Sequence, residues 1–379
     1  MFLLRSKRFD DNYVKSVSAS IGGVTRSREP SAAPTRQGRA TMTQVAELAG
    51  VGLKTVSRVV NGEPGVSTIL QERVRAAVKA LNYEADIYAG SLRRSSRRTF
   101  TVGLLVKDLA NPFSGAIARA VERSAAADRV AVLAASVDND ENRVDEIARA
   151  FMQRRVDGLI VAPADDGERV ARAAHAQGIP IVMIDRTPPR APVDSVVSDN
   201  RLGAELATEQ LLNHGHTRIA FLGEREGVFT ESERLAGFTR ALAKAGVPLD
   251  QAIIVQGVTS ASDASAQLAN LLTTHRPTAV FSAQNVISKG VIAELRRHGL
   301  ADGIAMVGFD DLEYATLLTP GITTVAQDPD LIGSTAAAIL LRRIEGDNGA
   351  PERVVVPTRL IARGSGEITA PGWRPRERP

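Results

Sequence analysis

From Thr99 onward, short runs of aliphatic residues alternate with longer segments whose apolar positions recur every three or four residues. Runs such as "TVGLLV" and "IAMVGF" are continuously hydrophobic, which is typical of parallel strands buried on both faces. Segments such as "ESERLAGFTRALAKAG" have the spacing of amphipathic helices. The alternation predicts parallel sheets covered by helices. Because residues 99–366 exceed the usual ~100–150 residues of one domain, we expect two α/β lobes.

Residues 41–83 follow a different pattern of short, polar segments with apolar residues at helical spacing. "TMTQ" places Thr41 and Gln44 at capping-box spacing, which marks the start of a helix. A further helix is expected from Ser67 to Leu81, with Asn82 as its C-cap. This part of the chain is therefore predicted to be a small all-α domain.

The stretch "TVSRVV" inside this domain can be interpreted in two ways. Four of its six residues are β-branched, so propensity alone favours a strand. A strand would place Arg58 on the same face as two valines and mix charge into a core. A helix instead lets Val56 and Val59 face Val45 and Leu48 of the preceding helix. We therefore predict a helix.

This pair of helices meets the requirements of a helix-turn-helix. Ala46 is small enough for the helices to approach each other, and Gly50 tolerates the positive φ of the turn. The positions that then point outward are Leu53, Lys54, Ser57 and Arg58. A polar and basic outer face suits a helix that enters the major groove of DNA.

Charge is distributed unevenly along the chain. The first 98 residues contain 17 Lys and Arg against 8 Asp and Glu, a net charge of +9, whereas the remainder contains 30 against 35, a net charge of −5. A basic head on a mildly acidic body indicates that the head meets a polyanion. The alternative is a charged segment that is merely solvated.

Composition narrows the class of protein further. The chain has no Cys, which excludes disulfides and zinc fingers and fits a reducing compartment. No stretch approaches 18 uninterrupted apolar residues, and "MFLLRSKRF" has too few for a signal peptide. We therefore expect a cytoplasmic, nucleoid-associated protein.

Three further segments complete the predicted organisation. Residues 1–40 lack periodicity and are expected to be a disordered basic extension, either an arm that touches DNA phosphates or an overlong gene start. Residues 84–98 are expected to form a hinge or linker helix. Residues 367–379 contain three prolines and are expected to be a flexible tail that cannot form a helix.

Polar residues directly after the aliphatic runs predict a ligand site, because ligands of two-lobed α/β proteins bind beyond the carboxyl ends of the strands. These residues are Asp185, Gln284, Asn285, Asp310 and Asp311, with Arg234 on a nearby helical segment. Carboxylates, an amide and an arginine would bind vicinal hydroxyls by charge-assisted hydrogen bonds. Phe113 could stack on the face of a sugar.

The segment from Thr41 to Tyr83, with its pieces "VAELAGV", "TVSRVVNG" and "ALNY", resembles the DNA-binding head of the LacI/GalR transcriptional repressors. The resemblance implies operator contacts at Thr41, Leu53, Lys54, Thr55, Ser57, Arg58 and Asn61. It also implies that Leu92, in the hinge, wedges between base pairs in the minor groove. Gly52 stands where the family usually has a Ser or Thr cap, which weakens the cap by only a few tenths of a kcal/mol.

The likeness continues to about Gly366, where the body resembles the periplasmic-binding-protein-like effector domain of the same family. By matched motif, the resemblance implies effector contacts at Phe113, Ser114, Asp185, Arg234, Asn285 and Asp310. Val286 stands where the family commonly has Asp. Sugars or sugar derivatives are the leading effectors, and purines or other small metabolites are the alternative.

An enzymatic alternative, a DNA-binding head fused to a sugar kinase, finds no support in the motifs. The sequence contains no GxxxxGK[ST] phosphate loop and no GxSxG nucleophile turn. "DNDEN" resembles the start of a calcium loop, but Arg143 occupies the position that requires Gly. We expect no catalytic residue, no metal site and no cofactor. The sequence predicts a ligand-responsive, sequence-specific repressor of carbohydrate-related genes that binds a pseudo-palindromic operator as a homodimer.

Overall fold

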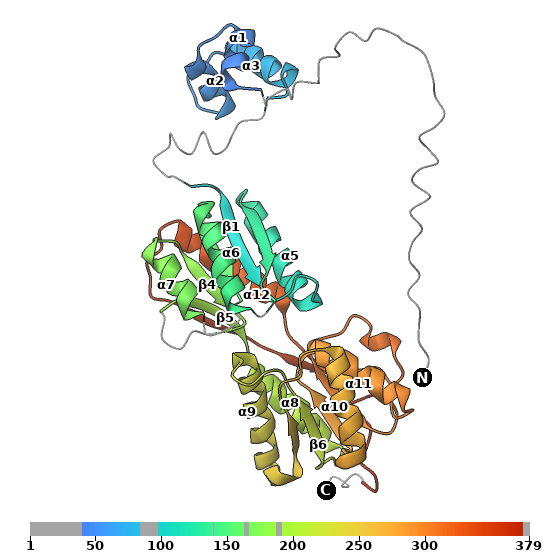
Figure 1. Ribbon diagram of the computed structural model, residues 1–379. Coiled ribbons are helices and arrows are strands. Elements are labelled where there is room, and N and C mark those ends of the chain that lie inside the picture. Colours follow the sequence, from blue (N-terminus) through green and yellow to red (C-terminus); the bar gives the residue numbers. More distant parts are fainter. Residues whose placement is uncertain (1–39, 84–97, 139, 163–166, 187–191, 374–379) are drawn as a thin grey trace, which may run out of the picture. The chain divides into compact units, whose positions relative to one another are not determined.

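The computed structural model describes residues 40–83, 98–138, 140–162, 167–186 and 192–373 (Figure 1). They belong to two compact units, a head within residues 1–90 and a body within residues 91–379. The predicted extension, most of the hinge and its Leu92 lie outside the described residues, so these predictions stay predictions. No helix in the described ranges is long and apolar enough to cross a membrane.

The head consists of three helices: α1 (Met42–Ala49), α2 (Leu53–Val60) and α3 (Thr68–Ala80). Thr41 and Gln44 form the predicted capping box at the start of α1. Gly50 adopts the left-handed conformation of the turn, with φ 63°. Gly52 caps α2 without any side-chain hydrogen bond, and the helix prediction for "TVSRVV" is confirmed.

Tertiary packing explains why the β-branched stretch is helical. Val56 is fully buried together with Val45 of α1 and Val74 of α3. Burial of these side chains outweighs a propensity difference of a few tenths of a kcal/mol per residue. The predicted contact of Leu48 with α2 is wrong, because 57% of Leu48 is exposed. The buried face of α1 is centred between Val45 and Ala46, roughly a third of a turn away from Leu48.

The body contains two six-stranded sheets, which define lobe 1 and lobe 2. Lobe 1 contains strands β1 (Thr101–Val106), β2 (Ala131–Ser136), β3 (Gly158–Val161), β4 (Ile181–Ile184), β5 (Asp194–Ser198) and β11 (Arg353–Val356), with helices α5 (Pro112–Ala127), α6 (Glu141–Gln153), α7 (Glu168–Ala176) and α12 (Pro329–Ile344). Lobe 2 contains strands β6 (Ile219–Leu222), β7 (Ile253–Val255), β8 (Ala279–Ser282), β9 (Ala305–Phe309), β10 (Thr323–Ala326) and β12 (Arg359–Ile361), with helices α8 (Asn200–Asn213), α9 (Phe229–Lys244), α10 (Ala261–Thr274) and α11 (Asn285–Arg297) and the short 3₁₀ helices η1 (Leu249–Gln251) and η2 (Ala315–Leu317).

The strand orders are β11-β5-β4-β3-β1-β2 in lobe 1 and β12-β10-β9-β8-β6-β7 in lobe 2. The strands of both sheets pair in parallel, except that β12 runs antiparallel to β10. The chain passes between the lobes after β5, after β10 and after β11 (Figure 1). These short connections join two separately packed lobes, which is the architecture that the strand–helix alternation predicts.

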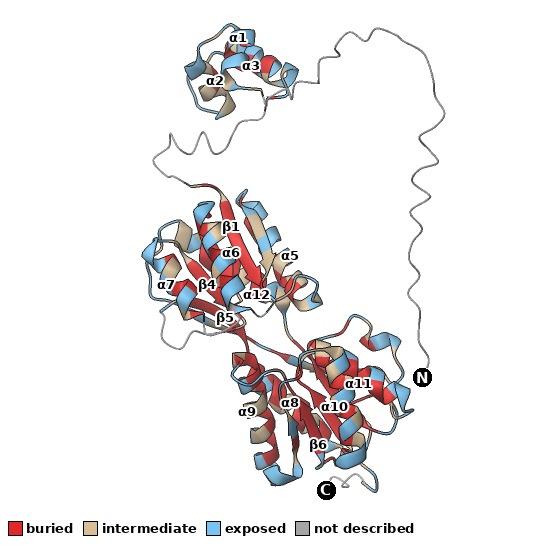
Figure 2. Ribbon diagram, viewed as in Figure 1, coloured by how far each residue is buried: buried red, intermediate tan, exposed pale blue. Residues whose placement is uncertain are grey.

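Each sheet is covered on both faces, so the central strands are buried (Figure 2). All six residues of β1 are buried, whereas β2, at the edge of its sheet, alternates between exposed and partly buried. Lobe 2 concentrates its aromatic packing in Phe221, Phe238 and Phe281, whose ring centroids lie 5.1–6.4 Å apart. The cores place the carboxyl ends of the strands of both lobes at a common cleft.

The predicted flexible tail begins too early in the sequence. Ile368 packs on the core of lobe 2, and its carbonyl oxygen lies 2.8 Å from His216 Nε2. The Ala370 N–H donates to the carbonyl oxygen of His214 over 2.9 Å. Trp373 covers Gly215, where any side chain would clash with the indole. Proline prevents a helix here but does not prevent an extended chain from packing. The other predicted domain boundaries stay predictions.

Candidate functional sites

The outer face of α2 is the candidate DNA-binding surface of the head. Leu53 and Lys54 are exposed at its start, and Ser57 and Arg58 are partly exposed one turn later. Arg58 Nε lies 4.0 Å from Glu63 Oε2, and both side chains are about half exposed. A contact of this length in solvent contributes little to stability. The guanidinium can therefore exchange this contact for a DNA partner at small cost.

The remaining residues predicted to contact DNA surround this face. Thr55 is partly exposed on α2, and Asn61, just after α2, donates from Nδ2 to Ser57 Oγ over 3.3 Å. Thr41 is exposed, and its Oγ1 accepts the Gln44 N–H in the cap of α1. The structure thus gathers the described members of the predicted set in one small unit. Their contacts with DNA stay predictions.

A second candidate site lies in the cleft of the body, where a pocket of about 60 Å³ takes residues from both lobes. Five of the six predicted effector residues line it, namely Phe113, Ser114, Asp185, Arg234 and Asp310. The sixth, Asn285, lies just behind the lining, where its backbone N–H donates to Asp310 Oδ2 over 3.2 Å. The rule that polar residues after strands converge therefore locates this pocket. Binding of an effector by these residues is a proposal, developed below.

Arg234 is the best-anchored cation of the cleft. It is 6% exposed, and its Nε donates to Asn200 Oδ1 over 2.8 Å. Its Nη1 donates to the carbonyl oxygen of Ala283 over 2.6 Å. Its guanidinium carbon lies 3.8 Å from the centroid of the Phe309 ring. These contacts fix a planar, permanently charged donor next to the pocket.

Two buried acceptor atoms at the pocket have no partner in the described part of the chain. They are Asp185 Oδ1 and Gln327 Oε1. Burial raises the pKa of the Asp185 carboxyl, and the charges of Arg234 and Arg186 oppose this shift. Gln327 is oriented by its Nε2, which donates to Asp310 Oδ1 over 2.5 Å. Because an unpartnered buried acceptor costs about 1–3 kcal/mol, the pocket is suited to a molecule that supplies donors.

Polar contacts hold the lobes together across the cleft. Lys107 of lobe 1 forms an ion pair with Glu224 of lobe 2. The side-chain amides of Asn111 and Asn285 exchange hydrogen bonds of 3.1 and 2.8 Å. We call these two pairs the cross-lobe contacts. At about 60 Å³ the pocket is much smaller than the ~300–1,000 Å³ of usual ligand sites, so a sugar-sized ligand requires the lobes to move apart.

Sequence reasoning missed Lys107, Glu224 and Gln327 as cleft residues. Each of them follows a strand by one or two positions, after β1, β6 and β10 respectively. The rule that selected Asp185 and Asp310 would therefore have selected them as well.

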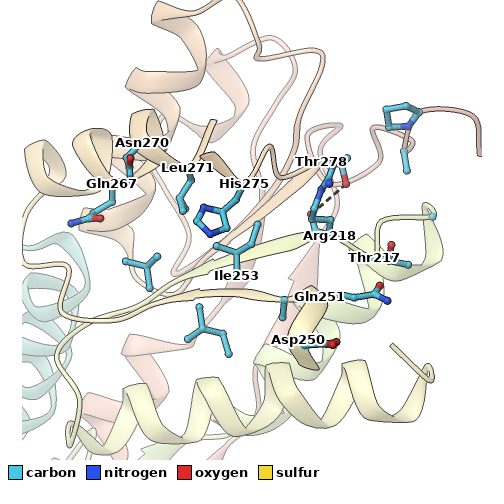
Figure 3. Close-up of a pocket in the computed structure, with 16 residues that line it drawn as sticks. Thr217, Arg218, Asp250, Gln251, Ile253, Gln267, Asn270, Leu271, His275 and Thr278 are labelled. Carbon is cyan, nitrogen blue, oxygen red and sulfur yellow. Dashed lines mark hydrogen bonds between the residues drawn. The ribbon is translucent and has the colours of Figure 1, made fainter. Parts of the chain in front are cut away.

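A larger hollow of about 920 Å³ lies elsewhere in lobe 2, along the edge strand β7 (Figure 3). Ile253 and Leu271 lie in it together with His275, while Asp250 and Arg218 lie near its border (Figure 3). None of the residues predicted from the sequence lines it. Among the described residues, no cluster of three or more His, Cys, Asp or Glu could hold a metal ion. The cleft remains the better-supported ligand site.

Glu231, in the first turn of α9, positions the loop that carries Glu224. It is 2% exposed, and its Oε2 accepts the Glu224 N–H over 3.0 Å. Its Oε1 accepts from Gln256 Nε2 over 3.3 Å. Gly223 leaves room for this carboxyl, because any side chain there would clash with it. Burial raises the pKa of Glu231 to about 7, against smaller opposing effects of the Glu224 N–H and Arg234.

Replacing Glu231 with Gln is expected to flatten the pH dependence of the stability of the body. The folded state keeps the Glu231 proton up to pH of about 7, whereas the unfolded chain loses it near 4.5. The free energy of unfolding therefore falls as pH rises through this window, by at most about 3 kcal/mol. Urea unfolding between pH 5 and 8 measures this slope. Glu233→Gln, on the same helix, is the control, and an equal slope in Glu231→Gln and wild type would contradict the assignment.

Comparisons with known proteins agree with the head and the body separately. Residues 41–86 match the model of bacterial regulatory proteins of the lacI family, and residues 208–366 match a periplasmic binding protein-like domain. The chain is 33% identical to the ribose operon repressor of Escherichia coli (strain K12), over 86% of this chain and 99% of that protein. It is 31% identical to the transcriptional repressor PurR of Aliivibrio fischeri (strain MJ11), over 86% of this chain and 98% of that protein.

Among solved structures, the chain is similar to the lac repressor dimer bound to operator and the anti-inducer ONPF. The TM-score is 0.78 with 28% sequence identity, over 86% of this chain and 99% of that one. These relatives are transcriptional regulators, so they fit the predicted repressor and not the fused sugar kinase. The predicted fold, a helix-turn-helix head followed by a two-lobed α/β domain with mostly parallel strands, is confirmed. The chain belongs to the lacI family of bacterial regulatory proteins and is a DNA-binding regulator of transcription.

Proposed function

We propose that this regulator represses carbohydrate-related genes by binding a pseudo-palindromic operator as a dimer and that a sugar or sugar derivative in the cleft changes its affinity for DNA. The observation that carries the ligand part is the pocket between the lobes, with its anchored Arg234 and its two unpartnered acceptors. The repressors among its relatives support the DNA part. Because its proposed partner is DNA, we propose that it acts in the cytoplasm, at the nucleoid.

The head supplies the DNA contacts in this proposal. Leu53 and Lys54 lie at the exposed start of α2, where side chains of a major-groove helix reach base edges. Ser57 and Arg58 follow one turn later, and Thr41, Thr55 and Asn61 flank them near the DNA backbone. Two heads of a dimer then read half-sites about one helical turn apart. Leu92 retains its predicted role as a minor-groove wedge.

The cleft supplies the effector site, and its chemistry favours a neutral polyhydroxylated molecule. Hydroxyl groups can donate to Asp185 Oδ1 and Gln327 Oε1 and accept from Arg234. Phe113 offers an apolar ring at the same pocket. The name of the ribose operon repressor gives this class of ligand independent support. Catalysis and a cofactor have no part in the proposal, because the relatives are regulators.

Effector binding would change the affinity for DNA by changing the arrangement of the two lobes. The pocket of about 60 Å³ is small for a sugar, so we expect its entry to separate the cross-lobe contacts Lys107–Glu224 and Asn111–Asn285. A ligand shifts such an equilibrium by its difference in affinity for the two lobe arrangements. The coupling to operator affinity would then be of the usual size, about 1–3 kcal/mol.

A thermal-shift screen of pentoses, hexoses, sugar phosphates and purines on the full chain tests the ligand class. A stabilising sugar that also changes operator affinity is the expected result. Stabilisation by purines alone would contradict the sugar assignment while leaving the cleft as the site. No effect of any small molecule on operator affinity would contradict the effector function.

Replacing Arg58 with Ala is expected to weaken operator binding about 10- to 100-fold, since a good base contact by arginine is worth about 1–3 kcal/mol. Fluorescence anisotropy with a duplex selected from random DNA by the wild-type protein measures the loss. Arg75→Ala, which removes the same charge from an exposed position on α3, is the matched control. Equal affinities of Arg58→Ala and wild type would refute α2 as the recognition helix.

A further inference from the structure

Several arginines lie at one edge of lobe 1, where the chain enters the body. In this lobe the helices run back along the sheet, so the ends of α5 and α6 meet the starts of β1, β2 and β3 (Figure 1). Hydrogen bonds join the loops at this edge to one another. The Ala131 N–H donates to the Phe100 carbonyl over 2.8 Å, and Thr99 Oγ1 donates to the Arg155 carbonyl over 2.8 Å.

Two arginines of this edge adopt a backbone conformation that arginine rarely takes. Arg129 follows α5 with φ 58° and Arg155 follows α6 with φ 59°, and both are exposed. This left-handed conformation costs an ordinary residue about 1–2 kcal/mol relative to Gly. At the equivalent position, five other helices of the body have glycine: Gly178, Gly215, Gly246, Gly299 and Gly346. Arg276, after α10 in lobe 2, is a third arginine with this geometry.

Arg129, Arg154 and Arg155 are exposed at this edge, although Arg154 Nη1 donates to the Ala150 carbonyl over 3.0 Å, and Arg98 is half-buried with its guanidinium carbon 5.3 Å from the centroid of the Phe100 ring. Among the described residues, no carboxylate oxygen lies within 4.0 Å of a guanidinium nitrogen of these four arginines. Asp157 is occupied, because its carboxylate accepts the N–H groups of Thr99 and Phe100 over 2.7 and 2.6 Å. Asp128, directly before Arg129, is exposed.

We propose that this arginine edge, made of Arg98, Arg129, Arg154 and Arg155, contacts phosphates of the same DNA duplex that the head binds. Residues 84–97 connect the head to the edge and can span at most roughly 50 Å, a length that allows both to reach one duplex. Exposed guanidinium groups without carboxylate partners suit phosphate oxygens. Such contacts add affinity without reading sequence. The inference rests on the operator binding proposed above.

The competing explanation is local, because a cation at the end of a helix also stabilises the helix dipole by about 0.3–1 kcal/mol. The two explanations differ in what salt does to DNA binding. Each phosphate contact contributes about 0.9 to the slope of log affinity against log salt concentration. A helix-dipole role contributes nothing to that slope.

The test compares full-length wild type, R129N/R155N and the control R172Q/R276N on one operator duplex across a range of salt concentrations. Asn keeps the left-handed backbone at low cost at positions 129, 155 and 276, and both double variants lose two exposed arginines per protomer. We expect R129N/R155N to reduce the slope by up to about 3.6 for a dimer and to leave the preference for operator over random DNA unchanged. The control should retain the wild-type slope.

Equal slopes for all three proteins would overturn the proposal, as would an equal reduction in both double variants. A change in urea stability of R129N/R155N with an unchanged slope would assign the arginines to helix stabilisation and also overturn it. Failure of the wild-type protein to prefer any duplex would instead count against the proposed operator binding. The two failures are therefore distinguishable.

Discussion

Replacing Arg234 with Met is expected to abolish the effector response of the repressor and to preserve its operator binding. Methionine fills a similar volume but leaves Asn200 Oδ1 and the Ala283 carbonyl without their donor. The substitution also removes the charge that most lowers the pKa of Asp185, so the pKa of that carboxyl rises further. Both changes alter the polar groups to which a sugar would bind. The operator contacts lie in the separate head and should persist.

Operator binding with and without the stabilising sugar measures this loss, together with the thermal shift that the sugar produces. Arg240→Met is the control, because Arg240 lies on the same helix with a side chain that is 66% exposed. Removing a buried charge partner can cost about 3–5 kcal/mol. Arg234→Lys therefore serves as a second variant, which keeps the charge and loses the planar donor. A normal effector response in both variants would remove Arg234 from the site.

Replacing Val56 with Asp is expected to unfold the head and abolish operator binding while the body keeps its melting temperature. The core of the head is small, and its buried residues are Val45, Ala46, Ala49, Val56, Val74, Ala77 and Tyr83. A core of this size supplies no more than about 3–5 kcal/mol of net stability. An unpaired carboxylate at a fully buried position costs at least that much.

Limited proteolysis and circular dichroism follow the head in this variant, and the thermal shift with sugar follows the body. The matched control is Leu48→Asp, which places the same charge on the exposed side of α1 and should leave the head folded. Retained operator binding by Val56→Asp would contradict the packing of α2 described here. Loss of binding in the control would indicate that Leu48 contacts a partner of the head.

Local sequence patterns predict the helices and strands. The features that these patterns do not predict depend on contacts between residues that lie far apart in the sequence. The alternation of buried strands and amphipathic helices is a property of each segment, so both lobes follow from it. The return of α12 and β11 to lobe 1 depends on pairing between β11 and β5, which lie more than 150 residues apart, and no local pattern encodes that. In the same way, the sequence does not show on which side of Val45 the buried face of α1 lies, because residues three and four positions later both neighbour Val45 on a helix. The structure buries Ala46 and Ala49, so Leu48 is exposed.

The effector pocket was easier to predict than its closure. Asp185 and Asp310 could be located because strand ends are visible in the sequence. The pairing of Asn111 with Asn285 could not, since it joins residues of two lobes whose approach depends on the whole fold. The unpartnered state of Gln327 Oε1 is likewise a property of three-dimensional packing.

Trp373 gives the protein a built-in optical reporter. It is the single tryptophan of the chain, and it lies over Gly215 with its ring centroid 6.1 Å from that of His214. Its emission therefore reports the environment at this end of lobe 2. Spectroscopy can thus record the unfolding of the effector domain without any label, in the same sample whose DNA affinity is being measured.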